Sequence, residues 1–92
     1  MRARRARRPT YAERLAAWRE HALTEARAHA ARLTASARYW LQDARRGGSL
    51  ASALNGLQDR AMARGWRLRA RELGNGAPLS SFEVEVAKMA GK

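Results

Sequence analysis

Residues 11–46 read YAERLAAWREHALTEARAHAARLTASARYWLQDARR, and the stretch contains neither glycine nor proline. Thr10 and Glu13 have capping-box spacing at its start, directly after Pro9. At about 100° per residue, one arc of roughly 80° collects mostly apolar side chains. Its members are Tyr11, Leu15, Trp18, Ala22, Ala26, His29, Leu33, Ser36 and Trp40. The sequence therefore predicts one amphipathic helix of up to about 36 residues, ~54 Å long.

A second, shorter helix is predicted to follow a glycine link. Gly47 and Gly48 end the first helix, and Ser49 can cap a helix that runs from Leu50 to about Arg64. Gly65 is a suitable residue to end it. Its apolar side consists of Leu50, Leu54, Leu57 and Ala61, with Met62 beside them. The short link predicts that the two helices pack as an antiparallel hairpin.

The hydrophobic period changes near the C-terminus. Residues 66–71 alternate apolar with basic side chains, and residues 82–86 alternate apolar with acidic ones. The turn-rich segment 74–78 separates the two runs. Antiparallel pairing of the runs places Arg69 opposite Glu83 and keeps the apolar side chains together on the other face. This pattern favours a C-terminal β-hairpin.

The alternative for the same region is a C-terminal helix. Ser80 and Glu83 have capping-box spacing, and Gly91 can end such a helix. The predicted fold class is thus α+β and mostly helical: a long N-terminal helix, a shorter antiparallel helix and a C-terminal β-hairpin. An all-α fold with a C-terminal helix is the alternative. Residues 10–92 are predicted to form a single small domain, preceded by a disordered basic arm at residues 1–9.

The charge of the chain is strongly one-sided. Its 92 residues carry 19 Lys and Arg against 8 Asp and Glu, which gives a net charge of +11. Such a balance favours a polyanionic partner, and arginine makes forked contacts to phosphate. Two clusters are predicted to bind the phosphate backbone of nucleic acid. One lies in the arm and the other near the end of the second helix: Arg2, Arg4, Arg5, Arg7 and Arg8, then Arg64, Arg67, Arg69 and Arg71.

The sequence offers no recognisable catalytic or metal-binding constellation. It has no cysteine, which excludes disulfides and thiolate ligands and fits a reducing compartment. His21, Glu25 and His29 recur every four residues, but the outer two stand ~12 Å apart along a helix and cannot share one ion. We therefore expect a non-enzymatic protein without a metal or cofactor.

These features favour a small accessory or regulatory protein that binds DNA or RNA. One alternative is a protein-interaction module or inhibitor that docks on an acidic surface of another protein or of a nucleic-acid-processing complex. Another is a structural component of a virion or ribonucleoprotein. An alanine-rich stripe on the long helix suggests a homo-oligomer. No apolar run approaches the ~18–20 residues that span a bilayer, so we expect no membrane partner and a cytoplasmic, nucleoid-associated or virion-associated protein.

Overall fold

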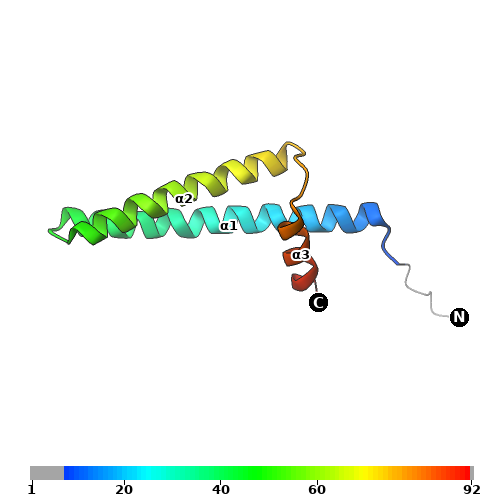
Figure 1. Ribbon diagram of the computed structural model, residues 1–92, viewed down its shortest axis with the longest axis horizontal. Helices are drawn as coiled ribbons and strands as arrows, with labels where there is room; N and C mark the ends of the chain where they lie inside the picture. Colours follow the sequence, from blue (N-terminus) through cyan, green and yellow to red (C-terminus); the bar gives the residue numbers. More distant parts are fainter. Residues whose placement is uncertain (1–7, 92) are drawn as a thin grey trace, which may run out of the picture.

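The computed structural model describes residues 8–91, which form three helices (Figure 1). They are α1 (Tyr11–Arg45), α2 (Leu50–Gly74) and α3 (Ser81–Ala90). Helices α1 and α2 lie side by side as a long antiparallel hairpin, and the short α3 crosses α1 away from the hairpin's loop. The predicted hairpin of two helices is therefore confirmed.

The first helix begins and ends where the sequence predicts. The backbone N–H of Thr10 donates to Glu13 Oε1 at 2.8 Å, and the N–H of Glu13 donates to Thr10 Oγ1 at 3.1 Å. This reciprocal pair satisfies two of the amide groups that every helix start leaves without a partner. At the other end, Gly47 adopts a φ of 91°, a conformation that side chains with a Cβ rarely take. The chain turns there into α2.

The predicted C-terminal β-hairpin is wrong, and the all-α alternative is correct. Within residues 8–91 the chain forms no strand. Helix α2 does not end near Arg64 but continues through Gly65 to Gly74. Residues 66–73 are mainly Arg, Leu and Ala, which favour helix, and Trp66, Ala70 and Leu73 share one face at helical spacing. The alternation in this segment is thus compatible with a helix that packs on α1.

The second run of alternating residues is also helical. Ser80 and Glu83 form a capping box, with Ser80 N–H donating to Glu83 Oε1 at 2.9 Å and Glu83 N–H donating to Ser80 Oγ at 3.1 Å. Ala87 is the buried residue of α3. The last turns of α2 and the whole of α3, joined by a six-residue link, therefore occupy the places of the two predicted strands.

The hairpin is packed with small side chains. Helix α1 buries Ala22, Ala26, Ala30 and Ala37, so its predicted alanine stripe is covered by the rest of the chain. Helix α2 buries Ser52, Gly56, Ala63 and Leu73. Small residues allow two helix backbones to approach closely along their length. The two longest elements are therefore joined by a narrow seam rather than by a thick hydrophobic core.

The predicted apolar side of α2 does not pack on α1. Leu50, Leu54 and Leu57 are 76%, 57% and 52% exposed. Near the loop, Ser52 and Gly56 on the opposite side of the helix face α1 instead. The sequence thus contains two candidate packing faces on α2, and the hairpin uses the one made of small residues.

Candidate nucleic-acid interface

An open groove of about 600 Å³ runs between α1 and α2 on one edge of the hairpin. Arginines from both helices line its walls: Arg27 and Arg38 from α1, and Arg67 and Arg71 from α2. Thr34 and four alanines make up the rest of the lining. The small residues keep the space between the arginines open, which leaves room for a ligand backbone.

A second depression of about 240 Å³ shares part of this lining and extends it toward the hairpin's loop. Arg38 and Arg67 border both depressions, and Arg60 borders the second. We refer to the two depressions together as the basic groove. Neither is lined by an acidic residue, and neither is lined by an aromatic one.

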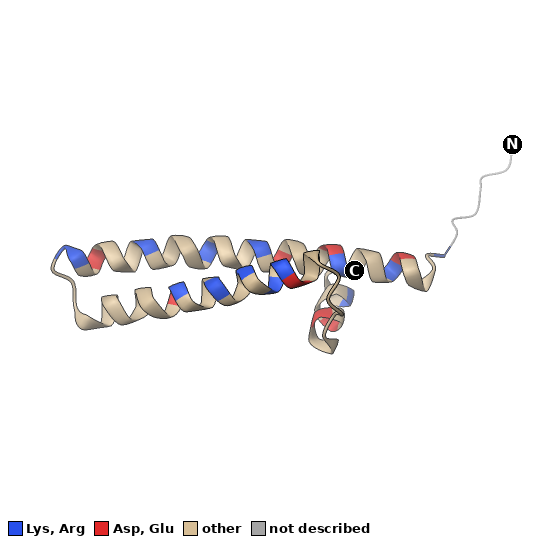
Figure 2. Ribbon diagram, turned by 90° about the horizontal axis from the view of Figure 1, so that it is seen from above, with Lys and Arg blue, Asp and Glu red and all other residues tan. Residues whose placement is uncertain are grey.

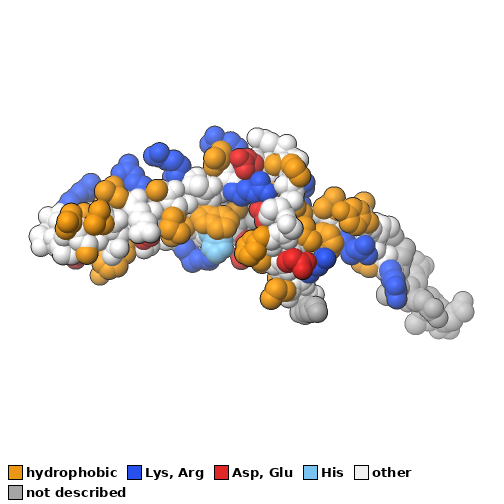
Figure 3. All heavy atoms as spheres, viewed as in Figure 1, with side chains coloured by type: hydrophobic (Ala, Val, Ile, Leu, Met, Phe, Trp, Pro, Cys, Tyr) orange, Lys and Arg blue, Asp and Glu red, His pale blue; other side chains and the backbone are white. Residues whose placement is uncertain are grey.

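The arginines of α2 form a regular row beside the groove. Arg60, Arg64, Arg67 and Arg71 are spaced by four, three and four residues and therefore share one face of the helix. We call these four residues the arginine row, and it spans about 16 Å along the axis. Seen from above, basic positions recur along both long helices (Figure 2). In the space-filling view, basic side chains project from the upper edge of the hairpin (Figure 3).

The charge of the basic groove is largely uncompensated. Arg67 NH1 donates to Thr34 Oγ1 at 3.0 Å, a contact with a neutral group. The side chains of Arg27, Arg38 and Arg71 make neither a hydrogen bond nor an ion pair with any other residue of the range 8–91. Unpaired guanidinium groups keep their donors available for an anionic ligand.

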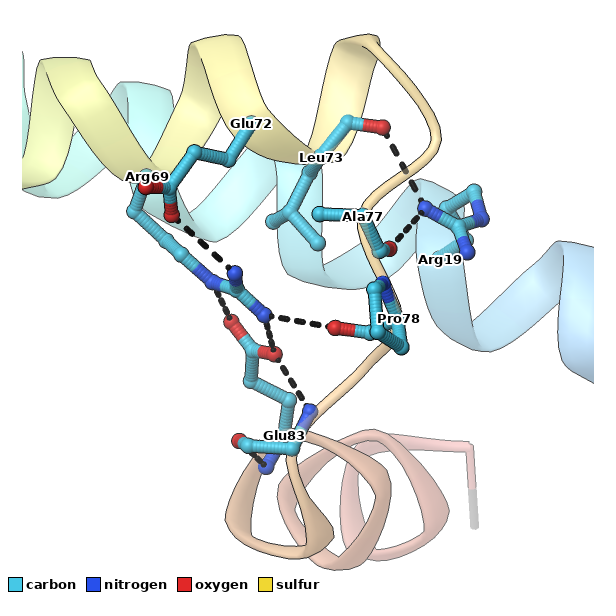
Figure 4. A network of polar contacts seen from close by, with 8 residues as sticks. Arg19, Arg69, Glu72, Leu73, Ala77, Pro78 and Glu83 are labelled. Carbon is cyan, nitrogen blue, oxygen red and sulfur yellow. Dashed lines mark hydrogen bonds and ion pairs between the residues drawn. The ribbon is translucent and has the colours of Figure 1, made fainter.

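Arg69 lies on the other side of α2 and is held by the fold. Its Nε donates to Glu83 Oε2 at 2.8 Å, its NH2 donates to the other carboxylate oxygen of Glu83, and NH1 lies 3.2 Å from Glu72 Oε1 (Figure 4). NH2 also donates to the Pro78 carbonyl at 3.1 Å. The hydrogen bonds from Arg69 lower the pKa of Glu83 from 4.5 to about 2, and the same pair raises the pKa of Arg69. Arg69 therefore anchors α3 to α2 and is not free for a ligand.

Of the other predicted site residues, Arg67 and Arg71 line the basic groove, Arg64 lies beside it, and Arg8 lies near the start of α1. Arg64, Arg67 and Arg71 belong to the arginine row, and Arg8 is exposed. Arg2, Arg4, Arg5 and Arg7 lie outside the described residues, as does most of the predicted arm.

Sequence reasoning missed Arg27, Arg38 and Arg60 as members of the site. Arg60 stands at helical spacing from Arg64 and Arg67, so a helical interpretation of this segment would have included it. Arg27 and Arg38 are eleven residues apart, the same interval at which the apolar residues of this helix recur.

The histidines of α1 do not form a metal site. Arg32 NH2 donates to His29 Nδ1 at 2.6 Å, and the His29 ring stacks on Trp66 at 4.6 Å between centroids. Within the described part of the chain, no group of three or more His, Cys, Asp and Glu could hold a metal ion. His29 and Trp66 therefore join α1 to α2.

The remaining indications of function come from hydropathy and from comparison with other proteins. None of the helices in residues 8–91 is both long enough and apolar enough to cross a bilayer. Comparisons with protein-family models, with curated proteins and with solved structures found nothing that matches this chain.

Proposed function

We propose that the protein is a non-enzymatic accessory or regulatory protein that binds duplex nucleic acid through the basic groove. The observation that carries this proposal is that arginines from two helices face one groove in which no acidic residue takes part. An acid-free array of this kind attracts a polyanion and holds it with charge-assisted hydrogen bonds.

The geometry supports a phosphate backbone as the ligand. The arginine row extends for about 16 Å, and successive phosphates of one DNA strand are spaced ~3.4 Å along the duplex axis, so the row matches about five of them. Arg27 and Arg38 lie on the opposite wall of the groove. Arginine suits such a ligand because its planar fork can contact two phosphate oxygens at once.

The absence of aromatic side chains from the lining favours a duplex over a single strand. Proteins that bind single strands without sequence preference stack the bases on aromatic rings. Here the groove offers alanine and threonine between the arginines, and Trp66 is engaged with His29. The contacts would therefore go to phosphate, which positions the protein without reading sequence.

Fluorescence anisotropy of labelled duplexes over a salt series tests the proposal. Five groove arginines, if each neutralises one phosphate, account for a slope of log affinity against log salt of about −4.5 on duplex DNA. The double variant Arg67→Gln, Arg71→Gln should make the slope shallower by about 1.8. The same titration with duplex RNA and single-stranded DNA identifies the preferred nucleic acid.

A matched control variant removes two positive charges from α1, outside the basic groove. Arg14 and Arg32 lie at helical positions away from Arg27 and Arg38, and they contact the Pro9 carbonyl and His29. Arg14→Gln with Arg32→Gln should leave the salt slope unchanged. Equal losses in both double variants would show that only net charge matters, and a salt-independent affinity would favour an acidic protein partner instead; either result would overturn the proposal.

A further inference from the structure

The outer face of α2 carries a stripe of exposed apolar residues. Leu50, Leu54, Leu57, Ala61 and Leu68 recur at spacings of four and three residues, with Arg64 in the remaining place. We call the five apolar residues the leucine stripe. This spacing is that of the seam of a coiled coil. The leucines are between 52% and 76% exposed, and hydrophobic side chains gather over the start of α2 at the left end of Figure 3.

The half of α2 next to the loop carries no charge. Residues 50–58 read LASALNGLQ. The first charged residue, Asp59, accepts a hydrogen bond from Ser36 Oγ on α1. Every basic residue of α2 lies from Arg60 onward. The leucine stripe therefore lies on uncharged surface near the loop and on strongly basic surface from Arg60 onward. Two copies that pair through it must keep their basic parts of α2 apart.

We propose that two copies of the chain pair through the leucine stripes of α2, with the helices antiparallel and residues 50–61 of each overlapping. The register places Leu54 against the partner's Leu57 and Leu50 against the partner's Ala61. Two-fold symmetry repeats both contacts. The pairing thus covers the most exposed leucines on α2, Leu50 and Leu54, together with Leu57.

Charge selects this arrangement over a parallel one. In parallel, Arg64 would face the partner's Arg64 inside the seam, which costs free energy because like charges repel in a dry environment. In the antiparallel register, Arg64 lies opposite the partner's Gly47, beyond the start of that helix. Arg60 lies beside the partner's Ala53. No arginine therefore meets a partner arginine, and Arg64, Arg67 and Arg71 of the two copies extend outward in opposite directions.

The oligomeric state measured without nucleic acid tests this inference independently of the proposed function. Sedimentation equilibrium over a concentration series should show twice the mass of one chain. Leu57 and Leu68 are both 52% exposed in the single chain, but only Leu57 lies inside the overlap. Leu57→Gln should raise the dimer dissociation constant more than about tenfold, whereas Leu68→Gln should leave it unchanged.

Both variants should keep the helical content of the wild-type chain when it is measured by circular dichroism in dilute solution, because neither side chain is part of the seam with α1. A wild-type chain that remains monomeric at high concentration would overturn the inference and leave the leucine stripe to another protein. Equal weakening by Leu57→Gln and Leu68→Gln would overturn the register.

Engineered cysteines test the direction of the helices, because the natural chain has no cysteine. A mixture of the Leu50→Cys and Ala61→Cys variants should form the mixed disulfide on oxidation, since antiparallel pairing brings these positions together. Arg64→Cys alone should form no disulfide. A disulfide between two Arg64→Cys chains, or the absence of the mixed disulfide, would contradict antiparallel pairing.

Discussion

Gly56 of α2 lies directly against Leu41 of α1. A Cβ atom at position 56 would stand 2.7 Å from Leu41 Cγ and 3.2 Å from the Leu41 backbone nitrogen. The second of these atoms belongs to the helix backbone and cannot rotate away. The glycine therefore sets how closely the two long helices approach near the hairpin's loop.

Gly56→Ala should destabilise the hairpin. Alanine gains up to about 1 kcal/mol of helix propensity over glycine, but overpacking a tight contact costs about 1–3 kcal/mol. We expect a net loss of about 1 kcal/mol in the free energy of unfolding, measured by urea denaturation followed by circular dichroism.

Gly65→Ala is the matched control in the same helix. A Cβ at position 65 meets no atom within 4 Å, so only the propensity gain remains. This variant should be more stable by about 0.5–1 kcal/mol. If both substitutions stabilise the protein equally, the close contact between Gly56 and Leu41 does not exist in solution.

The ion pair between Arg69 and Glu83 should make stability depend on pH. The pKa of Glu83 is about 2 in the folded chain and 4.5 ordinarily, so the folded state favours the charged form. The resulting stabilisation is complete above pH 4.5 and is lost as the pH falls toward 2. Urea denaturation at a series of pH values should show this decline in the wild type.

Glu83→Gln should lower stability at pH 7 by about 1–2 kcal/mol and flatten the profile between pH 5 and 2. Glu85→Gln provides the control, because the Glu85 side chain is 67% exposed and pairs with Lys88, whose side chain is 52% exposed. Exposed pairs of this kind contribute little. If Glu83→Gln has the same dependence of stability on pH as the wild type, the ion pair between Arg69 and Glu83 does not form in solution.

Ala63 and Ala61 lie two residues apart on opposite sides of α2. Ala63 is 1% exposed in the seam, whereas Ala61 is exposed in the leucine stripe. Ala63→Leu should destabilise the hairpin by about 1–3 kcal/mol because there is no room for a larger side chain. Ala61→Leu should leave the monomer's stability unchanged and tighten the proposed dimer, as sedimentation equilibrium would show. If Ala61→Leu destabilised the hairpin and Ala63→Leu did not, the side of α2 that carries Ala61 would be the one that packs on α1.

Arg19 connects α1 to the end of α2 and to the following link. Its NH1 donates to the Leu73 carbonyl at 3.2 Å and to the Ala77 carbonyl at 2.7 Å (Figure 4). Arg19→Gln should therefore speed hydrogen exchange of the amides in residues 75–80, measured by mass spectrometry. Arg14→Gln should not, because the Arg14 side chain contacts the nearby Pro9 carbonyl and Tyr11 ring and does not reach this link.

Both ends of α1 and the start of α2 were predictable because they carry local signals, whereas the end of α2 was wrongly placed near Arg64 instead of Gly74. Thr10 with Glu13, the Gly47–Gly48 link and Ser49 mark boundaries that depend on neighbouring residues alone. The C-terminal region was ambiguous because its alternating pattern suits both a strand and a helix. What decides between them is the packing of Trp66 and Leu73 against α1, a contact with residues far away in the sequence.

The candidate interface was only partly predictable for the same reason. A strand places Arg67, Arg69 and Arg71 on one side, whereas a helix turns Arg69 toward Glu83 and brings Arg60 beside Arg67. Arg27 and Arg38 of α1 line the groove only because α2 folds back along α1. The side of α2 that packs on α1 was not predictable from the sequence either. Hydrophobicity favours burial of the leucines, whereas close packing of the helices favours burial of Gly56 and Ser52.

The seam of alanine, serine and glycine has a thermodynamic consequence. Burying such side chains removes little apolar surface from water, and the heat-capacity change of unfolding grows with that surface. We therefore expect a shallow curve of stability against temperature for the single chain, with broad thermal melting. Pairing of the leucine stripes would add apolar burial and sharpen the melting transition as protein concentration rises.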